Sequence, residues 1–342
     1  MLVSAPFLIQ RLLEGRVRHR SLVWAYLTAL VAIAAATVLL LAALLVRYLP
    51  HEYLVRAGLS CIEESGVCAA SLPPWAGPPY SFLMGGVIGG LILYFVATVC
   101  SQLGLSRCHQ AGLSRVARAD REVPTTGRSF QFPERLVVLE NSTPTSYTIG
   151  FLRPQVVVST GLSVALEEEE VTAVLAHEEA HVVGYDNVIL LVAQSLGRTF
   201  ALVPGARRAL ARLRRAQEIA ADEYAREKTG DGLVVASGLE KFARSVSPAP
   251  LQMVGVSAFA EGTGVTERIW GLLTEPELIL RSRRYVIAVV AGLLLIFSIF
   301  TGSALAFTEV SVDTRGACSG CHMSSHGDGA ARAAHGDCCL RF

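Results

Sequence analysis

Three long apolar stretches restrict this chain more than any other feature of its sequence. Residues 22–46, 80–105 and 285–307 contain no Asp, Glu, Lys or Arg, and each exceeds the about 20 helical residues that cross a bilayer. Only 17% of all residues are charged, below the roughly one quarter typical of soluble domains. We therefore expect a mainly α membrane protein with three transmembrane helices. The first is too long for a cleaved signal peptide and is expected to stay as an anchor.

Basic residues predict how these helices are oriented. Arginines precede the first span at 11–20, follow the second at 107–121 and precede the third at 281–284. The positive-inside rule places all three clusters in the cytoplasm. We therefore expect a multi-pass protein of the cell's inner membrane. Its cytoplasmic parts are residues 1–21 and a soluble domain at 106–280, and its outer parts are a loop at 47–79 and a tail at 308–342. The net charge of +1 gives no reason to expect nucleic acid as a partner.

Cysteine placement agrees with this orientation. Six of the eight cysteines fall in the two outer segments, where disulfides are stable. Cys61 and Cys68 are a possible local disulfide in the outer loop. The outer set comprises Cys61, Cys68, Cys318, Cys321, Cys338 and Cys339, and Cys100 and Cys108 lie at the inner end of the second span.

The inner domain contains the sequence His177-Glu178-Glu-Ala-His181 within a helix-like apolar pattern. Residues four apart on a helix share one face, so His177 and His181 can direct two imidazoles at one Zn²⁺ ion. Glu178 is then placed to accept a proton from a water molecule at the metal. The alternative is a helix with two surface histidines, but the flanking sequence favours the metal site.

A third metal ligand in the inner domain has to be a carboxylate. Apart from the motif itself, residues 110–317 contain no histidine and no cysteine. Glu218 is the preferred ligand, and Asp222, one helical turn later, is expected to hydrogen-bond a ligating imidazole. Glu223 is the fallback ligand, and the alternative for this segment is a solvated helix face. Asp186 lies five residues beyond the motif, which predicts that it points to a different face of the same helix.

Several other segments of the inner domain have recognisable patterns. Residues 135–140, 146–150 and 155–160 are predicted strands. The acidic run at 167–170 is interpreted as a solvated helix end, favoured there by the helix dipole. Residues 188–204 are apolar but short for a span, so we expect them to pack against the motif helix, lie at the membrane surface or form a re-entrant segment.

The motif and the later Glu218-Ile-Ala-Ala-Asp222 resemble the gluzincin membrane metallopeptidases. The closest resemblance is to the BlaR/MecR family of antirepressor and sensor-transducer peptidases, and the HtpX and CAAX prenyl protease family is a near relative. The resemblance covers about residues 135–230 and implies an α+β metallopeptidase domain. It implies zinc binding by His177, His181 and Glu218, catalysis by Glu178, and an orienting role for Asp222.

The chain departs from the BlaR pattern in two respects. It has three predicted transmembrane helices instead of four, and no penicillin-binding sensor domain follows the last one. The resemblance therefore does not imply β-lactam sensing. The expected activity is zinc-dependent endopeptidase cleavage of a protein substrate, either a cytosolic repressor in transmembrane signalling or, in HtpX-like quality control, a membrane protein. Tyr185 and Tyr224 are candidate oxyanion donors, and the strand at 155–159 is a candidate edge for binding the substrate.

The tail contains Cys318-Ser-Gly-Cys321-His322, followed by Cys338-Cys339. Cys-x-x-Cys-His is the attachment signature of c-type haem. His322 would be the proximal ligand of such a haem, and plain disulfides or a small zinc site are the alternatives. A second functional class is therefore a redox or haem-binding membrane protein with a vestigial peptidase domain. Candidates for the sixth haem ligand are Met323, His326 and His335.

Overall fold

The computed structural model describes residues 7, 9, 18–47, 77–116, 136–245, 256–258 and 264–274. The predicted third span, the outer loop with Cys61 and Cys68, and the cysteine-containing tail lie outside these residues. The third transmembrane helix, the disulfide and the haem therefore stay predictions of the sequence.

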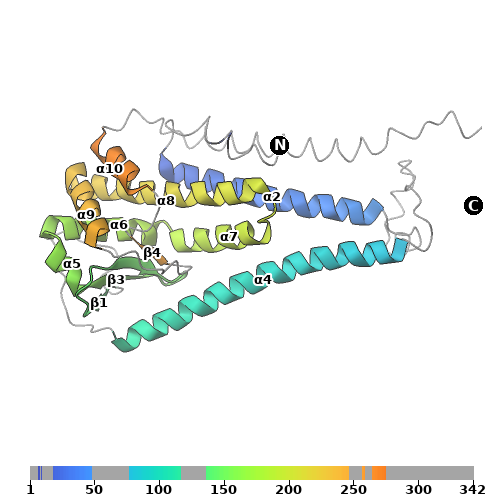
Figure 1. Ribbon diagram of the computed structural model, residues 1–342, viewed down its shortest axis with the longest axis horizontal. Helices are drawn as coiled ribbons and strands as arrows, with labels where there is room; N and C mark the ends of the chain where they lie inside the picture. Colours follow the sequence, from blue (N-terminus) through green and yellow to red (C-terminus); the bar gives the residue numbers. More distant parts are fainter. Residues whose placement is uncertain are drawn as a thin grey trace, which may run out of the picture.

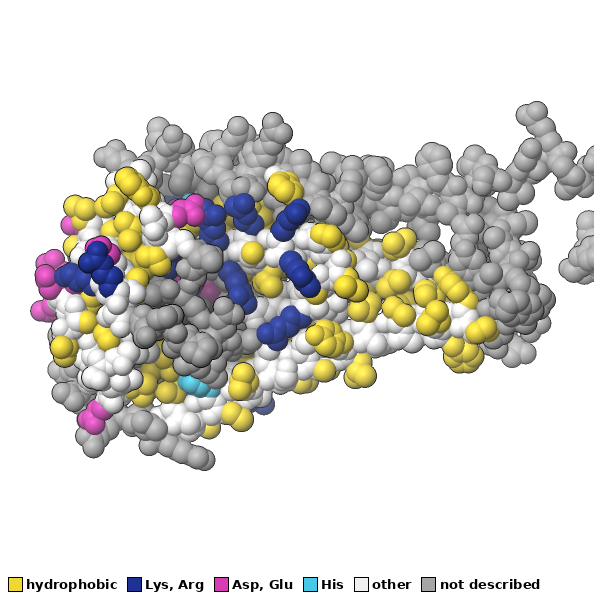
Figure 2. Space-filling model, in the orientation of Figure 1, with side chains coloured by type: hydrophobic (Ala, Val, Ile, Leu, Met, Phe, Trp, Pro, Cys, Tyr) yellow, Lys and Arg dark blue, Asp and Glu magenta, His cyan; other side chains and the backbone are white. Residues whose placement is uncertain are grey.

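Two long helices correspond to the first two predicted spans. Helix α2 is His19–Arg47 and helix α4 is Gly77–Val116. Their segments His19–Ala42 and Phe82–Leu113 are long and apolar enough to cross a membrane, and only 6% of the second is buried inside the protein. The start of α2 and the end of α4 lie at the same end of the molecule (Figure 1). Charged side chains gather at that end, whereas hydrophobic side chains cover the opposite end (Figure 2).

A four-stranded mixed sheet lies at the charged end (Figure 1). Its strands are β1 Leu136–Leu139, β2 Ser146–Ile149, β3 Gln155–Ser159 and β4 Val256–Ala258, in the order β1-β3-β2-β4. The three predicted strands are confirmed, and β4 was not predicted. Strand β3 is parallel to β1 on one side and antiparallel to β2 on the other. The expectation that β3 binds substrate as an added strand is wrong, because both of its edges are already paired.

Alternation along the strands gives the sheet two different faces. Val157 and Ile149 point to the face covered by Leu113, near the end of α4. Val156 and Val158 point to the other face, where they share a core with the motif helix. The sheet is thus packed between the C-terminal end of a candidate membrane helix, α4, and the helix that carries the motif.

The motif helix α6, Glu168–Val183, follows the short helix α5, Thr160–Ala165. Glu167 and Glu170 form a capping box at its start. The solvated helix end predicted for the acidic run holds for the first three residues, but Glu170 is 5% exposed. Its carboxylate accepts a hydrogen bond from Ser237 and pairs with Lys241 because a later helix covers it.

Four more helices complete the described chain: α7 Asp186–Thr199, α8 Pro204–Thr229, α9 Gly232–Ser245 and α10 Val265–Leu273. Helix α7 contacts α2, α4 and α8 as well as the motif helix. At 1.5 Å per residue it is about 21 Å long, too short to cross a hydrocarbon layer of about 30 Å. Helix α7, which contains residues 188–199, thus packs against α2, α4 and α8 as well as the motif helix, and a position at the membrane surface or a re-entrant segment stays a prediction.

Candidate metal centre

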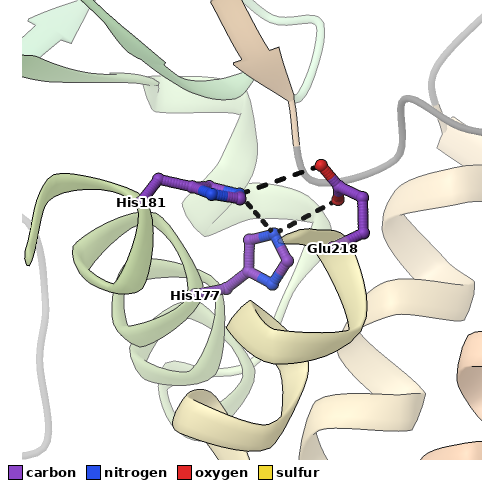
Figure 3. Close-up of side chains that lie close together, drawn as sticks. All are labelled: His177, His181 and Glu218. Atoms are coloured by element: carbon purple, nitrogen blue, oxygen red, sulfur yellow. Dashed lines mark hydrogen bonds and ion pairs between the residues drawn. The ribbon is translucent and has the colours of Figure 1, made fainter. Parts of the chain in front are cut away.

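His177 and His181 project from one face of α6 toward the same point (Figure 3). Their Nε2 atoms are 3.2 Å apart, and both side chains are buried. The rings meet edge to face with an interplanar angle of 84°. This arrangement follows from the spacing of four residues, which places the second imidazole one turn above the first.

Glu218 on α8 completes a set of three ligand atoms. Its Oε2 lies 3.6 Å from Nε2 of His177, and its Oε1 lies 3.9 Å from Nε2 of His181. All three ligand atoms lie within 4.8 Å of one another. Tetrahedral ligands at about 2.0–2.2 Å from a zinc ion are about 3.3–3.6 Å apart. The two imidazoles and the carboxylate thus fit a zinc ion closely, with a small adjustment of Glu218, as the sequence predicted.

Asp222 holds His177, and Arg268 holds Asp222. The carboxylate of Asp222 lies 2.9 Å from Nδ1 of His177 and accepts hydrogen bonds of 2.6 and 2.7 Å from Arg268 on α10. The predicted orienting role of Asp222 thus agrees with the geometry, whereas no sequence pattern indicated Arg268. Its guanidinium also lies 3.2 Å from Oε2 of Glu218, so one cation contacts two carboxylates of the site.

These contacts explain the acid–base properties of the metal-free site. Burial opposes ionisation of Asp222, but Arg268 outweighs it and lowers the pKa of Asp222 to about 2. Burial likewise opposes protonation of His177, but its hydrogen bonds to Asp222 and Glu218 raise its pKa to about 9. Since a ligating imidazole has to present an unprotonated nitrogen, metal binding competes with protonation of His177.

Asp186 holds the second histidine, contrary to the prediction that it faces away. Its Oδ2 lies 2.8 Å from Nδ1 of His181, and its other oxygen accepts a hydrogen bond from Arg20. The prediction assumed one continuous helix, but Tyr185 adopts a left-handed conformation with φ 54° and separates α6 from α7. The helix is interrupted there, and the carboxylate of Asp186, the first residue of α7, reaches His181 of the motif.

Glu178 lies on the sheet side of α6 and is fully buried. Ser146 and Thr148 of β2 donate hydrogen bonds of 3.2 and 2.7 Å to its two carboxylate oxygens. Burial raises the pKa of Glu178 above its ordinary value, although the neighbouring imidazoles and Thr148 act in the opposite direction. The strand is predicted from the sequence, but the role of these two hydroxyls is not. Ser146 and Thr148 occur at alternate positions and so share a face of the strand.

The structure places the remaining candidates elsewhere. Glu223, the fallback ligand, has Oε1 at 2.7 Å from Nδ1 of His19. Tyr224 interacts with Glu179, and burial together with that carboxylate raises the pKa of Tyr224 to about 12. Tyr185 is 64% exposed at the corner between α6 and α7. Among the residues that the structure describes, neither Tyr185 nor Tyr224 contacts the three ligand atoms. Their positions therefore do not support the predicted role as oxyanion donors.

Residues 113–209 match the model of peptidase family M48. This region contains strands β1, β2 and β3 and the His177–His181 motif, but it ends before Glu218 and β4. A protein named protease HtpX homolog from Acidiphilium cryptum (strain JF-5) is 31% identical over 121 residues, which is 34% of this chain and 41% of the relative. A second HtpX homolog, from Bordetella avium (strain 197N), is 34% identical over 91 residues, or 24% of this chain and 31% of the relative.

The chain thus spans less than half the length of these two relatives in the regions that match. No solved structure matches it. The matches support a resemblance to membrane metallopeptidases of the HtpX type. These matches fit a resemblance to the HtpX family at least as well as a resemblance to the BlaR/MecR family.

Proposed function

We propose that this protein is a membrane-anchored, zinc-dependent endopeptidase. The observation that carries the proposal is the convergence of His177, His181 and Glu218, with their ligand atoms within 4.8 Å of one another. The buried carboxylate of Glu178 lies on the same helix, next to the first of these ligands. The match to peptidase family M48 supports hydrolysis of peptide bonds as the reaction.

Each residue of the site has a separate task in this proposal. His177, His181 and Glu218 hold the zinc ion, which when bound polarises the peptide carbonyl and lowers the pKa of water. Asp222 and Asp186 fix the two imidazoles so that each presents Nε2 to the metal. Arg268 keeps Asp222 ionised in a site from which bulk water is largely excluded.

Glu178 acts as the general base and later as the general acid. It takes a proton from the attacking water and returns it to the leaving amine. Because burial raises its pKa, Glu178 is a stronger base than an exposed carboxylate. The hydroxyls of Ser146 and Thr148 restrict its two oxygens, so the carboxylate keeps one orientation while it exchanges the proton.

The substrate class in this proposal is a protein. Regulated proteolysis of a cytosolic repressor and HtpX-like turnover of membrane proteins both require this site. The names of the similar proteins favour the second role. The metal site is linked to the start of α2 through Arg20 and Asp186. Charged side chains gather at this end of the molecule (Figure 2), and the positive-inside rule supports a cytoplasmic location for the site.

Glu178→Gln tests the proposal directly. The variant keeps all three ligands and nearly the same shape, so it should bind zinc with the same stoichiometry as the wild type, while losing cleavage of a denatured protein substrate by at least about a thousandfold. His177→Ala is the matched control, in which both zinc content and cleavage should fall. Proteolysis at the wild-type rate in Glu178→Gln would refute the assignment of the base. Proteins that remain bound to Glu178→Gln, compared with wild type, identify the substrate.

A further inference from the structure

Arg20 connects a candidate membrane helix to the metal site. It lies in the first turn of α2, and its Nη1 donates a hydrogen bond to Oδ1 of Asp186. The other oxygen of Asp186 is 2.8 Å from Nδ1 of His181, whose Nε2 faces His177 and Glu218. Two side chains therefore separate the backbone of α2 from the atom that would bind the metal.

The carboxylate of Asp186 pairs with Arg20 through one oxygen and contacts His181 through the other. The side chain of Asp186 is 1% exposed, whereas that of Arg20 is 33% exposed, so the cation reaches inward from the edge of the site. Gln217 binds the backbone oxygen of Asp186 and leaves the carboxylate to Arg20 and His181. A buried carboxylate that loses its cation turns toward another donor, and this movement changes how it holds the imidazole.

Gly184 provides an independent observation about the same contact. A Cβ atom at this position would lie 1.5 Å from Nη2 and 2.2 Å from Cζ of Arg20. The backbone of Gly184 is right-handed, with φ −80° and ψ −9°, a conformation that any residue adopts. The backbone therefore does not require glycine here, and the missing side chain makes room for the guanidinium of Arg20.

The two residues that precede Arg20 in the chain make similar contacts that do not lead to the metal site. Arg18 lies 3.0 Å from Glu227, and His19 lies 2.7 Å from Glu223. Both carboxylates belong to α8, and neither contacts a ligand histidine in the described structure. Arg18 is therefore a matched control, because it is also an arginine paired with a carboxylate and lies just before α2, and its partner Glu227 does not contact a ligand histidine in the described structure.

We propose that Arg20 is a positioning residue that makes the orientation of His181, and hence the affinity for the metal, dependent on the position of α2. The inference rests on the proposed zinc site and adds a mechanical connection between that site and the membrane. A displacement of the first turn of α2 along or around its axis removes the guanidinium from Asp186. The metal ligand then loses its fixed orientation although no residue of the motif has changed.

Binding of Co²⁺ to the full-length protein in detergent tests this coupling. Co²⁺ takes the place of zinc, and its visible absorption spectrum reports the geometry of the ligands. Arg20→Met should weaken Co²⁺ binding about tenfold, the lower end of the effect for residues behind metal ligands, and should change the spectrum. Arg18→Met should leave both properties at wild-type values. Arg20→Lys, which keeps the charge, should recover most of the affinity.

Gly184→Ala tests the same contact without removing any polar group. Alanine at a right-handed position ordinarily leaves stability unchanged or raises it. Here it should displace Arg20 and weaken Co²⁺ binding to about the level of Arg20→Met. The double variant should be little weaker than either single variant, because both remove one interaction. If circular dichroism shows that Arg20→Met folds poorly, the Gly184→Ala variant still tests whether Arg20 supports metal binding.

The outcomes separate the two proposals. Wild-type protein that binds no Co²⁺ would overturn the zinc site, and the coupling with it. Wild-type protein that binds Co²⁺, with Arg20→Met and Gly184→Ala matching Arg18→Met in affinity and spectrum, would overturn the coupling alone. Fully additive losses in the double variant would also contradict it, since they would mean that Gly184 and Arg20 act on the site separately.

Discussion

Replacing Arg268 with methionine should destabilise the protein more than loss of any ion pair at its surface. Methionine keeps the length of the apolar stem but removes the guanidinium. The exposed fractions of the Arg268 and Asp222 side chains are only 5% and 3%. Asp222 would therefore lose both hydrogen bonds to Arg268, of 2.6 and 2.7 Å, without access to water as a replacement.

The expected magnitude follows from the charge state of Asp222. Burial disfavours its ionised form, yet Arg268 brings its pKa from 3.8 down to about 2. At about 1.4 kcal/mol per pKa unit, this fall alone corresponds to about 2 kcal/mol. Removing Arg268 also leaves the cost of burial uncompensated. We therefore expect a loss of about 3–5 kcal/mol in the free energy of unfolding, as for other buried ion pairs that lose one partner.

Unfolding of the metal-free protein in increasing guanidinium chloride, monitored by tryptophan fluorescence, measures this free energy. Trp270 is a suitable probe because it lies on the same helix as Arg268. The control is Arg215→Met. Arg215 pairs with Glu267 next to Arg268 in sequence, but these side chains are 40% and 55% exposed. Loss of that exposed pair should cost at most about 1 kcal/mol. Equal losses for Arg268→Met and Arg215→Met would refute the reasoning.

A double-mutant cycle adds a second check. Asp222→Asn removes the charge that Arg268 compensates, so the double variant should be much more stable than the sum of the two single losses predicts. Additive losses would mean that Arg268 stabilises the protein through packing and not through Asp222.

Three further predictions concern single sites. Gly161→Ala should lower the free energy of unfolding by about 1–3 kcal/mol, because the Cβ of the new alanine would lie 2.2 Å from the carbonyl oxygen of Ser142. The same denaturant unfolding experiment measures this loss. The pKa of His177 is raised from 6.5 to about 9 in the metal-free protein, so protonation of this side chain should stabilise the fold. The contribution should be fully present below pH 6.5 and lost as pH rises through 9. The melting temperature of the metal-free protein at pH 6.5 and at pH 9.5 checks the direction of this change. Thr148→Val removes a 2.7 Å hydrogen bond to the base and should slow cleavage about tenfold or more in a peptide assay, whereas an unchanged rate would exclude this role.

The ligands of the candidate site could be predicted because their positions follow from local rules. Helical spacing determines that His177 and His181 share a face, and this requires no knowledge of the rest of the fold. Elimination indicated a carboxylate, since residues 110–317 contain no histidine or cysteine outside the motif, and Glu218 was preferred because it lies in a helix-like segment one turn before Asp222. Asp222 followed from its position one turn later on the same helix. Strands β1, β2 and β3 were recognisable because each is a short β-branched run between turns.

The supporting residues could not be predicted in this way, because they depend on how distant segments meet. Arg268 is 46 residues from Asp222, and Arg20 is 166 residues from Asp186. Asp186 was misassigned because continuous helical spacing was assumed through Tyr185, where the chain leaves the helix. Ser146 and Thr148 lay in a predicted strand, but their contact with the base depends on the packing of that strand against α6.

The packing of α2 against α8 has a practical consequence for recombinant work on this protein. Ala209, Leu213 and Ala216 of α8 share one hydrophobic core with Leu22, Tyr26 and other residues of α2. A shortened chain that starts after the first span would expose this apolar face to solvent and would leave Asp186 without Arg20. A soluble fragment cut at the membrane boundary is therefore a poor substitute for the intact protein, and purification in detergent or lipid nanodiscs is the suitable starting point.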